Sequence, residues 1–283
     1  MKVGLLLEGG AMRGMYTAGV LDVLLENNIK VDLIIGVSAG ALFGVNYKSR
    51  QKGRAYRFNS RYIHDKRYFG MYSLVTTGNI LNQDFCFKDI PEVLDDFNYG
   101  SFKRTKEEFY AVVTNMKTGK AEYKKIEDVK KDIESLRASG SMPFVSKPVE
   151  IDGELYLDGG IADGIPIQKM VSMGVDKIIA VLTRPEEYRK KKMNLTLAKV
   201  MYKDYPNLIE TMKNRHKVYN KSIEEVNFLS EENEAFLIRP SKYIKMKRVE
   251  KDEKVLAQMY NLGVSDMQEK IEDLKKYLKE KND

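Results

Sequence analysis

The chain has 283 residues, of which 43% are apolar, and carries a formal net charge of +7. This length is enough for one full-sized domain with an additional segment. The single cysteine, Cys86, excludes an internal disulfide framework and a multi-cysteine zinc site. No stretch approaches the ~20 consecutive apolar residues of a membrane span. The first apolar run is too short for a signal peptide, so we expect a cytoplasmic protein.

Alternating strands and helices are predicted for the first fifty residues. Short apolar runs predict buried strands at 3–7 and 31–36, and apolar residues at helical spacing predict a helix over 15–28. A second helix is predicted from Ala39 onward. This order predicts parallel strands joined by right-handed crossovers.

The pattern is weaker in the next part of the chain, because residues 48–108 are rich in Tyr, Phe, Arg and Asn without clear periodicity. Residues 109–125 predict two strands around a Thr-Gly turn, and residues 149–160 predict a hairpin turning at Asp-Gly. A further buried strand is predicted at 176–183.

The last third of the chain is charged and mostly helical, with a predicted edge strand at 234–240. The final thirty residues predict an amphipathic helix whose apolar face carries Leu256, Tyr260, Met267, Ile271, Leu274 and Leu278. We therefore expect a core α/β domain over 1–185 and a charged, helical extension over 186–283 packed on it.

Basic residues are concentrated in two short runs, at 189–192 and 242–248. We expect both runs on solvated faces. Peripheral contact with an anionic membrane surface is the alternative, since each Lys or Arg near such a surface contributes about 1 kcal/mol. Nucleic acid is not an expected partner, because the chain has no zinc pattern and no helix-turn-helix.

A serine between two glycines, Gly36-Val37-Ser38-Ala39-Gly40, follows the second predicted strand and precedes a helix. A serine hydroxyl becomes a useful nucleophile when it is exposed beside a base and an oxyanion site. A sharp strand-to-helix turn provides that exposure, and the flanking glycines leave room for the crowded backbone. Ser38 is therefore a candidate nucleophile, although the pattern alone is common.

The histidines do not fit a conventional triad. Ser38 comes after only two strands, which is too early for an α/β-hydrolase. His64 precedes any plausible acid, and His216 lies in a strongly charged helix, where we expect it to be solvated. A general esterase with a Ser38–Asp158–His216 triad stays open as an alternative.

A glycine-rich loop at 8–14 follows the first strand and opens a helix. It lacks the Lys and Ser/Thr of a phosphate-binding loop after Gly14, and Ala11 replaces the second glycine of a dinucleotide fingerprint. Its backbone N–H groups, at Gly9, Gly10 and Ala11, can instead form an oxyanion hole, where one donor is worth roughly 3–4 kcal/mol. A non-enzymatic module that binds phosphate or a lipid headgroup is the second alternative.

Asp158 is the candidate base, at the end of the predicted strand that leads into Gly159-Gly160. Asp-Gly-Gly by itself is equally typical of a simple turn. In α/β sheets, however, active-site side chains collect at strand ends. A carboxylate with little water around it has a raised pKa and can accept a serine proton.

These motifs together resemble the patatin-like phospholipase family. The resemblance rests on residues 9–14, 36–40 and 158–160, and on the longer stretch 137–167, and it covers about residues 1–185. It implies a three-layer α/β/α fold with a mainly parallel sheet. It also implies hydrolysis of acyl esters in phospholipids or neutral lipids by a Ser–Asp dyad, without histidine, metal or cofactor.

Carried over by position, the resemblance makes Ser38 the nucleophile and Asp158 the proton acceptor. Ala11 departs from the family, which usually has glycine there; its methyl group needs room and a negative φ. We expect Arg13 to bond to loop carbonyls rather than to a lipid phosphate. The oxyanion hole and its supports are implied at Gly9, Gly10, Ala11, Arg13, Gly14, Gly36, Gly40, Gly159 and Gly160.

The span 67–87 is rich in Tyr, Phe and Met. It is predicted to line an acyl pocket or to form a surface-docking flap, with ordinary core packing as the alternative. If it lines the pocket, enlarging Met71 or Leu74 should shift the preferred acyl-chain length.

Overall fold

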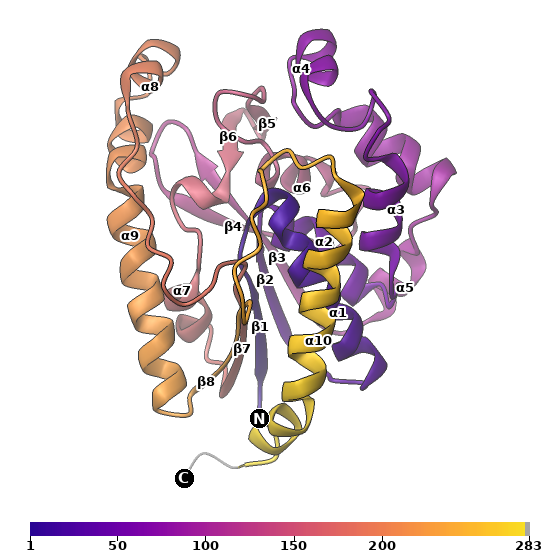
Figure 1. Cartoon of the computed structure of the whole chain (residues 1–283). Coiled ribbons are helices and arrows are strands. Elements are labelled where there is room, and N and C mark those ends of the chain that lie inside the picture. Colours follow the sequence, from indigo (N-terminus) through magenta and orange to yellow (C-terminus); the bar gives the residue numbers. More distant parts are fainter. Residues whose placement is uncertain (281–283) are drawn as a thin grey trace.

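The chain folds around a mixed eight-stranded sheet in a computed structural model that describes residues 1–280 (Figure 1). The strands are β1 (Val3–Leu7), β2 (Leu33–Val37), β3 (Glu108–Asn115), β4 (Ala121–Lys125), β5 (Val149–Ile151), β6 (Glu154–Asp158), β7 (Lys177–Val181) and β8 (Ala235–Ile238). Hydrogen-bonded neighbours connect the strands in the path β5-β6-β3-β2-β1-β7-β8, and β4 also pairs with β3. The neighbours β3, β2, β1, β7 and β8 run parallel, whereas β4, β5 and β6 are joined by antiparallel pairing.

Helices cover both faces of this sheet, as Figure 1 shows. One face packs on α1 (Met15–Glu26), α2 (Ala39–Lys48) and α10 (Glu253–Tyr277), and the other on α7 (Ile167–Ser172) and α9 (Pro206–Glu231). Side chains alternate along β1, so Leu5 and Leu7 belong to the first apolar cluster and Leu6 to the second. The predicted three-layer α/β/α fold with a mainly parallel sheet is confirmed.

The central strands are buried on both sides, which explains their continuous apolar sequences. Each strand predicted from sequence is present within about two residues of its expected position. The predicted hairpin joins β5 and β6, and its two turn residues, Asp152 (φ 53°) and Gly153 (φ 80°), both have positive φ. Such a pair is typical of a tight two-residue hairpin turn.

Residues 48–108, for which the sequence pattern was weak, form short helical segments. These are α3 (Arg54–Tyr62), α4 (Met71–Thr77), the π-helical η2 (Phe85–Leu94) and α5 (Tyr99–Arg104). Short segments give little periodicity, and their aromatic side chains pack on one another, as Tyr62 and Tyr68 do on Phe85. The remaining short elements are η1 (Ala11–Gly14), α6 (Ile133–Ser139), η3 (Gly159–Ile161) and α8 (Thr196–Met201).

The C-terminal segment extends the same sheet and the same core. β8 adds a parallel edge strand beside β7, and α10 packs closely along α1. A Cβ added to Gly263 would lie 2.1 Å from the carbonyl oxygen of Tyr16, so the two backbones nearly touch. The Tyr16 hydroxyl also donates to Asp266 Oδ2, 3.1 Å away. The domain boundary near 185 stays a prediction.

Within residues 1–280, none of the helices combines the length and the apolar character needed to cross a bilayer.

Candidate active site

Ser38 occupies a strained turn between β2 and α2. Its backbone has φ 53° and ψ −123°, a conformation that residues with a side chain rarely adopt and that is often found at functional sites. Its N–H donates to Ser139 Oγ, 2.9 Å away, from the 137–167 stretch. Gly40 lets α2 start close to β1, because a Cβ there would lie 2.4 Å from the Leu7 carbonyl oxygen.

Asp158 reaches Ser38 because two strands meet end to end along one side of β3. β2 pairs with β3 up to Val37↔Val112, and β6 pairs with it from Val113↔Asp158. β4 pairs with the overlapping stretch 110–114 and must therefore occupy the other side of β3. β6 runs antiparallel to β3, so its carboxyl end points at the carboxyl end of β2. Asp158 thus lies at a strand end, as expected, and that strand is antiparallel to β3.

The two side chains are in direct contact. Ser38 Oγ donates a hydrogen bond to Asp158 Oδ2 at 2.6 Å, and the Gly160 N–H donates to Oδ1 at 2.7 Å. Ser38 is 8% exposed and Asp158 6%. Burial raises the pKa of Asp158, whereas the Ser38 hydrogen bond, the Arg215 charge and the Gly160 N–H lower it. The carboxylate is thus placed to take the serine proton without an intervening residue.

Neither histidine belongs to this arrangement. His216 Nδ1 lies 3.1 Å from the Lys213 carbonyl oxygen on the surface of α9, and His216 does not line either of the pockets that contain Ser38. His64 is mostly exposed beside Glu253.

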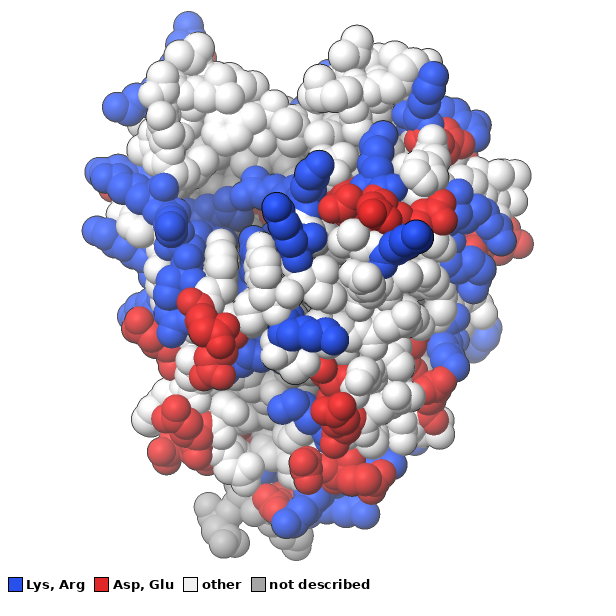
Figure 2. Space-filling model, in the orientation of Figure 1, with Lys and Arg blue, Asp and Glu red and all other residues white. Residues whose placement is uncertain are grey.

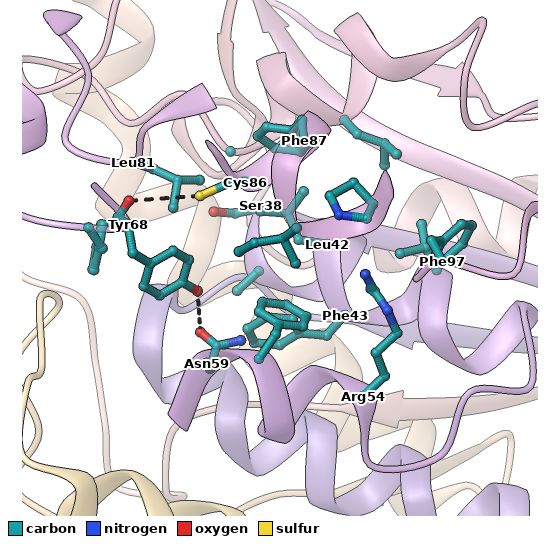
Figure 3. Close-up of a pocket in the computed structure, with 18 of the residues that line it drawn as sticks. Ser38, Leu42, Phe43, Arg54, Asn59, Tyr68, Leu81, Cys86, Phe87 and Phe97 are labelled. Carbon is teal, nitrogen blue, oxygen red and sulfur yellow. Dashed lines mark hydrogen bonds between the residues drawn. The ribbon is translucent and has the colours of Figure 1, made fainter. Parts of the chain in front are cut away.

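An apolar pocket of about 1010 Å³, including its open mouth, extends from Ser38 (Figure 3). Most of its wall comes from α2 and from the helical segments between 54 and 97. Met71 is 67% exposed, and neither it nor Leu74 lines the pocket, so the acyl-pocket alternative does not hold for these two positions. Other side chains of the span 67–87 do line the pocket, among them Tyr68, Leu81 and Phe87. Lining residues drawn in Figure 3 include Leu42, Phe43, Tyr68, Leu81, Cys86, Phe87 and Phe97.

A second pocket, of about 710 Å³ with its mouth, also borders Ser38. We call it the cationic pocket, because five basic side chains and two carboxylates line it. Ser38, Ala11 and Met142 border both pockets. The charged residues of the cationic pocket are Glu8, Arg13, Asp158, Arg184, Lys190, Arg215 and Arg248.

Sequence reasoning missed most of these charges. Lys190 and Arg248 belong to the two basic runs that were expected on solvated faces; Lys190 is instead partly buried, whereas Arg248 is exposed as expected but at the rim of this pocket. Arg13 forms no side-chain hydrogen bond within residues 1–280, and its buried Nε has no acceptor, so the expected bonds to loop carbonyls are absent. A run of charges in the sequence gives no signal of which side chain turns inward.

The glycine loop lies against the serine. A Cβ on Gly9 would lie 2.9 Å from Ser38 Cβ. Across the described residues, the N–H groups of Gly10 and Ala11 donate no backbone hydrogen bond. Ala11 has φ 50°, so the expectation of a negative φ was wrong. The left-handed region costs alanine about 1–2 kcal/mol, a strain that the surrounding structure can hold.

The fold, the serine turn and the buried carboxylate together define a patatin-like α/β protein. The chain belongs to the patatin-like phospholipase family, whose model matches residues 5–171. A second model, described as a domain of unknown function (DUF6363), matches residues 205–279.

Similar proteins span a wide range of lengths. The chain is 28% identical over 196 residues to the uncharacterized protein YjjU of Escherichia coli. This alignment covers 66% of this chain and 53% of YjjU. It is 32% identical over 191 residues to "Lysophospholipase nte1" of Emericella nidulans, covering 63% of this chain and 12% of that protein. The chain therefore spans about half of the first relative and about an eighth of the second.

A solved structure, that of VipD from Legionella pneumophila, aligns with this chain at a TM-score of 0.47 and 14% sequence identity. The alignment covers 96% of this chain and 67% of the VipD chain.

Proposed function

We propose that this chain is a lipid acyl hydrolase that cleaves carboxylic esters through Ser38 and Asp158. The observation that carries the proposal is the 2.6 Å hydrogen bond to a buried carboxylate from Oγ of Ser38, a residue that lines an apolar pocket. Family membership and the lysophospholipase named among the relatives support an ester of a fatty acid as the substrate.

In the proposed mechanism, Ser38 Oγ attacks the ester carbonyl carbon while its proton passes to Asp158. The N–H groups of Gly10 and Ala11 stabilise the tetrahedral oxyanion. When the intermediate collapses, the carbon–oxygen bond to the alcohol breaks and Asp158 returns the proton to the leaving oxygen. Water then gives a proton to Asp158 and attacks the acyl-enzyme, and Ser38 regains its proton as the fatty acid leaves.

The test is hydrolysis of a short-chain aryl ester by the wild type and by Ser38→Ala and Asp158→Asn. Loss of a general base typically costs 10²–10⁴-fold in rate, so both variants should fall at least a hundredfold. Near-normal rates in either variant would rule out the dyad.

Two further measurements separate the alternatives. His216→Ala should retain wild-type turnover under the dyad and lose it under a triad. A fluorophosphonate should label the wild type but not Ser38→Ala, while a non-enzymatic phosphate-binding module would not be labelled at all.

We also propose that the substrate is reached from a lipid surface. Helices α4 and α8 project from the same end of the molecule, and Figure 2 shows Lys and Arg gathered around the hollow between them. Apolar tips above a basic surface suit an anionic bilayer. The exposed apolar side chains on these helices are Met71, Tyr72, Val75, Leu197, Val200 and Met201.

Vesicle pelleting tests this docking. The wild type should bind vesicles containing anionic lipid, and binding should weaken with salt because exposed charges are screened. The double variant Val75→Glu/Val200→Glu should bind at least tenfold less, whereas Val171→Glu on α7, away from this end, should not change binding. Equal pelleting of both variants would refute the proposed orientation.

A further inference from the structure

The position of Ser38 between two unlike pockets divides a bound ester into two parts. Ser38 borders both the apolar pocket and the cationic pocket. An ester carbonyl at its hydroxyl therefore directs the acyl chain one way and the alcohol portion the other. The apolar pocket suits the acyl chain, which leaves the alcohol portion facing Arg and Lys side chains.

The two carboxylates in the cationic pocket offset the five cations only in part and form no salt bridge with them. Glu8 accepts hydrogen bonds from the N–H and hydroxyl of Thr183 and from the Tyr219 hydroxyl, at 2.6, 3.1 and 2.7 Å. Asp158 is engaged by Ser38 and by the Gly160 N–H. Among the described residues, none of the five basic side chains forms a salt bridge.

Instead, the basic groups are held by neutral partners. Lys190 Nζ lies 3.8 Å from the centre of the Tyr219 ring, and the Arg184 guanidinium lies 4.2 Å from that of Tyr188. Arg215 Nε donates to the Gly160 carbonyl oxygen at 2.5 Å. The remaining N–H groups of this set stay available to an anion.

Burial beside other cations lowers the pKa of two of these groups, Arg13 and Lys190. Burial, with the charges of Arg184 and Arg248, lowers the pKa of Arg13 to about 10. Burial and the charge of Arg215 lower the pKa of Lys190 to about 7, against the opposing effect of Glu8. Arg13 Nε is buried without an acceptor. A bound anion would supply the missing acceptor and relieve the repulsion.

We propose that the cationic pocket binds the phosphate of the alcohol portion and selects substrates whose headgroup is net anionic over those whose headgroup is zwitterionic or neutral. This inference rests on the proposed function and adds a specificity to it. A quaternary ammonium finds no free carboxylate here, and the Tyr188 and Tyr219 rings already pair with cations. Arg215 and Arg248 belong to the segment matched as a domain of unknown function, which thereby gains a role in choosing the headgroup.

The first test measures binding without turnover, so it is independent of whether the dyad is correct. Ser38→Ala protein is titrated by calorimetry with octyl ethers of phosphoglycerol, phosphocholine and glycerol, below the concentrations at which they form micelles. The phosphoglycerol ether should bind at least tenfold more tightly than the other two. Equal affinities would overturn the proposal. Inorganic phosphate that binds as tightly as the phosphoglycerol ether would also overturn it, because the site would then serve a free anion.

Variants then identify the residues responsible. Arg248→Gln and Lys190→Gln should each reduce the preference for the phosphoglycerol ether at least fivefold. Arg248 is exposed, so its variant should fold even if Lys190→Gln does not. Lys245→Gln is the matched control, an exposed cation of the same segment that does not line the pocket. The assignment of these residues to headgroup binding would be refuted if Arg248→Gln kept the full preference for the phosphoglycerol ether. It would also be refuted if Lys245→Gln lost as much of this preference as Arg248→Gln.

A second test uses hydrolysis. With eight-carbon lysophospholipids, kcat/KM should be at least tenfold higher for the phosphoglycerol than for the phosphocholine headgroup, and Arg248→Gln should lower this ratio. Ether binding with the expected preference but no hydrolysis would leave the headgroup site standing and remove the proposed activity. Hydrolysis of both lipids at equal kcat/KM would support the proposed activity and refute the headgroup selectivity.

Discussion

Gly40→Ala should damage the active site without touching any reacting group. A Cβ at Gly40 would lie 2.4 Å from the Leu7 carbonyl oxygen and 2.8 Å from that of Glu8, whereas ordinary contacts begin at 3.4 Å. Both obstacles are backbone atoms of β1 and the glycine loop, so the start of α2 must move by about 1 Å, and Ser38 must move with it. Overpacking of this kind costs about 1–3 kcal/mol. A displacement of about 1 Å at a catalytic group costs about a hundredfold in rate.

Two measurements on Gly40→Ala follow from these magnitudes. Thermal unfolding should show a Tm lower by several degrees, since about 1 kcal/mol corresponds to 2–4 °C in a protein of about this size. Aryl-ester hydrolysis and fluorophosphonate labelling should fall about a hundredfold. Gly100→Ala is the control, because its added methyl would come close only to the end of the flexible Arg104 side chain and would make an ordinary contact, at 3.7 Å, with Asn98 Oδ1. Wild-type Tm and labelling rate in Gly40→Ala would refute the steric argument.

Further predictions concern the base, the pocket and the core. Arg215→Gln removes a positive charge that lowers the pKa of Asp158, so the acid limb of kcat/KM should move to higher pH. Arg215→Lys should leave the limb in place; an unmoved limb in the Gln variant would contradict Asp158 as the base. Leu81→Trp narrows the apolar pocket and should shift hydrolysis toward shorter acyl chains, while Met71→Trp should not; identical profiles would exclude the pocket as the acyl site. Leu274→Ala empties a fully buried position of α10 and should lower the free energy of unfolding in urea by about 2–5 kcal/mol; a loss under 0.5 kcal/mol would contradict its packing.

Local patterns were sufficient to predict the core of the fold. The central parallel strands are buried on both faces, so their apolar runs are continuous, and the turn at Asp152-Gly153 has a specific residue requirement. The strained turn at Ser38 was also visible, because glycines flank it where α2 must approach β1 closely. In each case a short local pattern was enough, even where the contact that requires it, as between Gly40 and Leu7, joins distant parts of the sequence.

The contact between Ser38 and Asp158 could not be derived in the same way. It depends on where β2 stops along β3 and where β6 begins on the same side. Neither strand's sequence specifies that register by itself. The family resemblance paired the two residues, and they are in contact in the structure. The expected strand-end position of Asp158 is found, on a strand antiparallel to β3. Ala11 was misjudged for a related reason, since its φ is imposed by the loop and not by the residue.

Helix α9 explains why the segment after residue 185 matters for a site whose motifs all lie between residues 9 and 160. Arg215 and Tyr219 are four residues apart and therefore lie on the same face of α9. Tyr219 donates to Glu8 at the start of the glycine loop, and Arg215 donates to the carbonyl oxygen of Gly160, beside Asp158. One helix thus holds the loop that supplies the free N–H groups and the turn that supplies the carboxylate, and it places Arg215 in the cationic pocket. The same contacts therefore couple the geometry of the proposed dyad to the charge that we propose selects the headgroup.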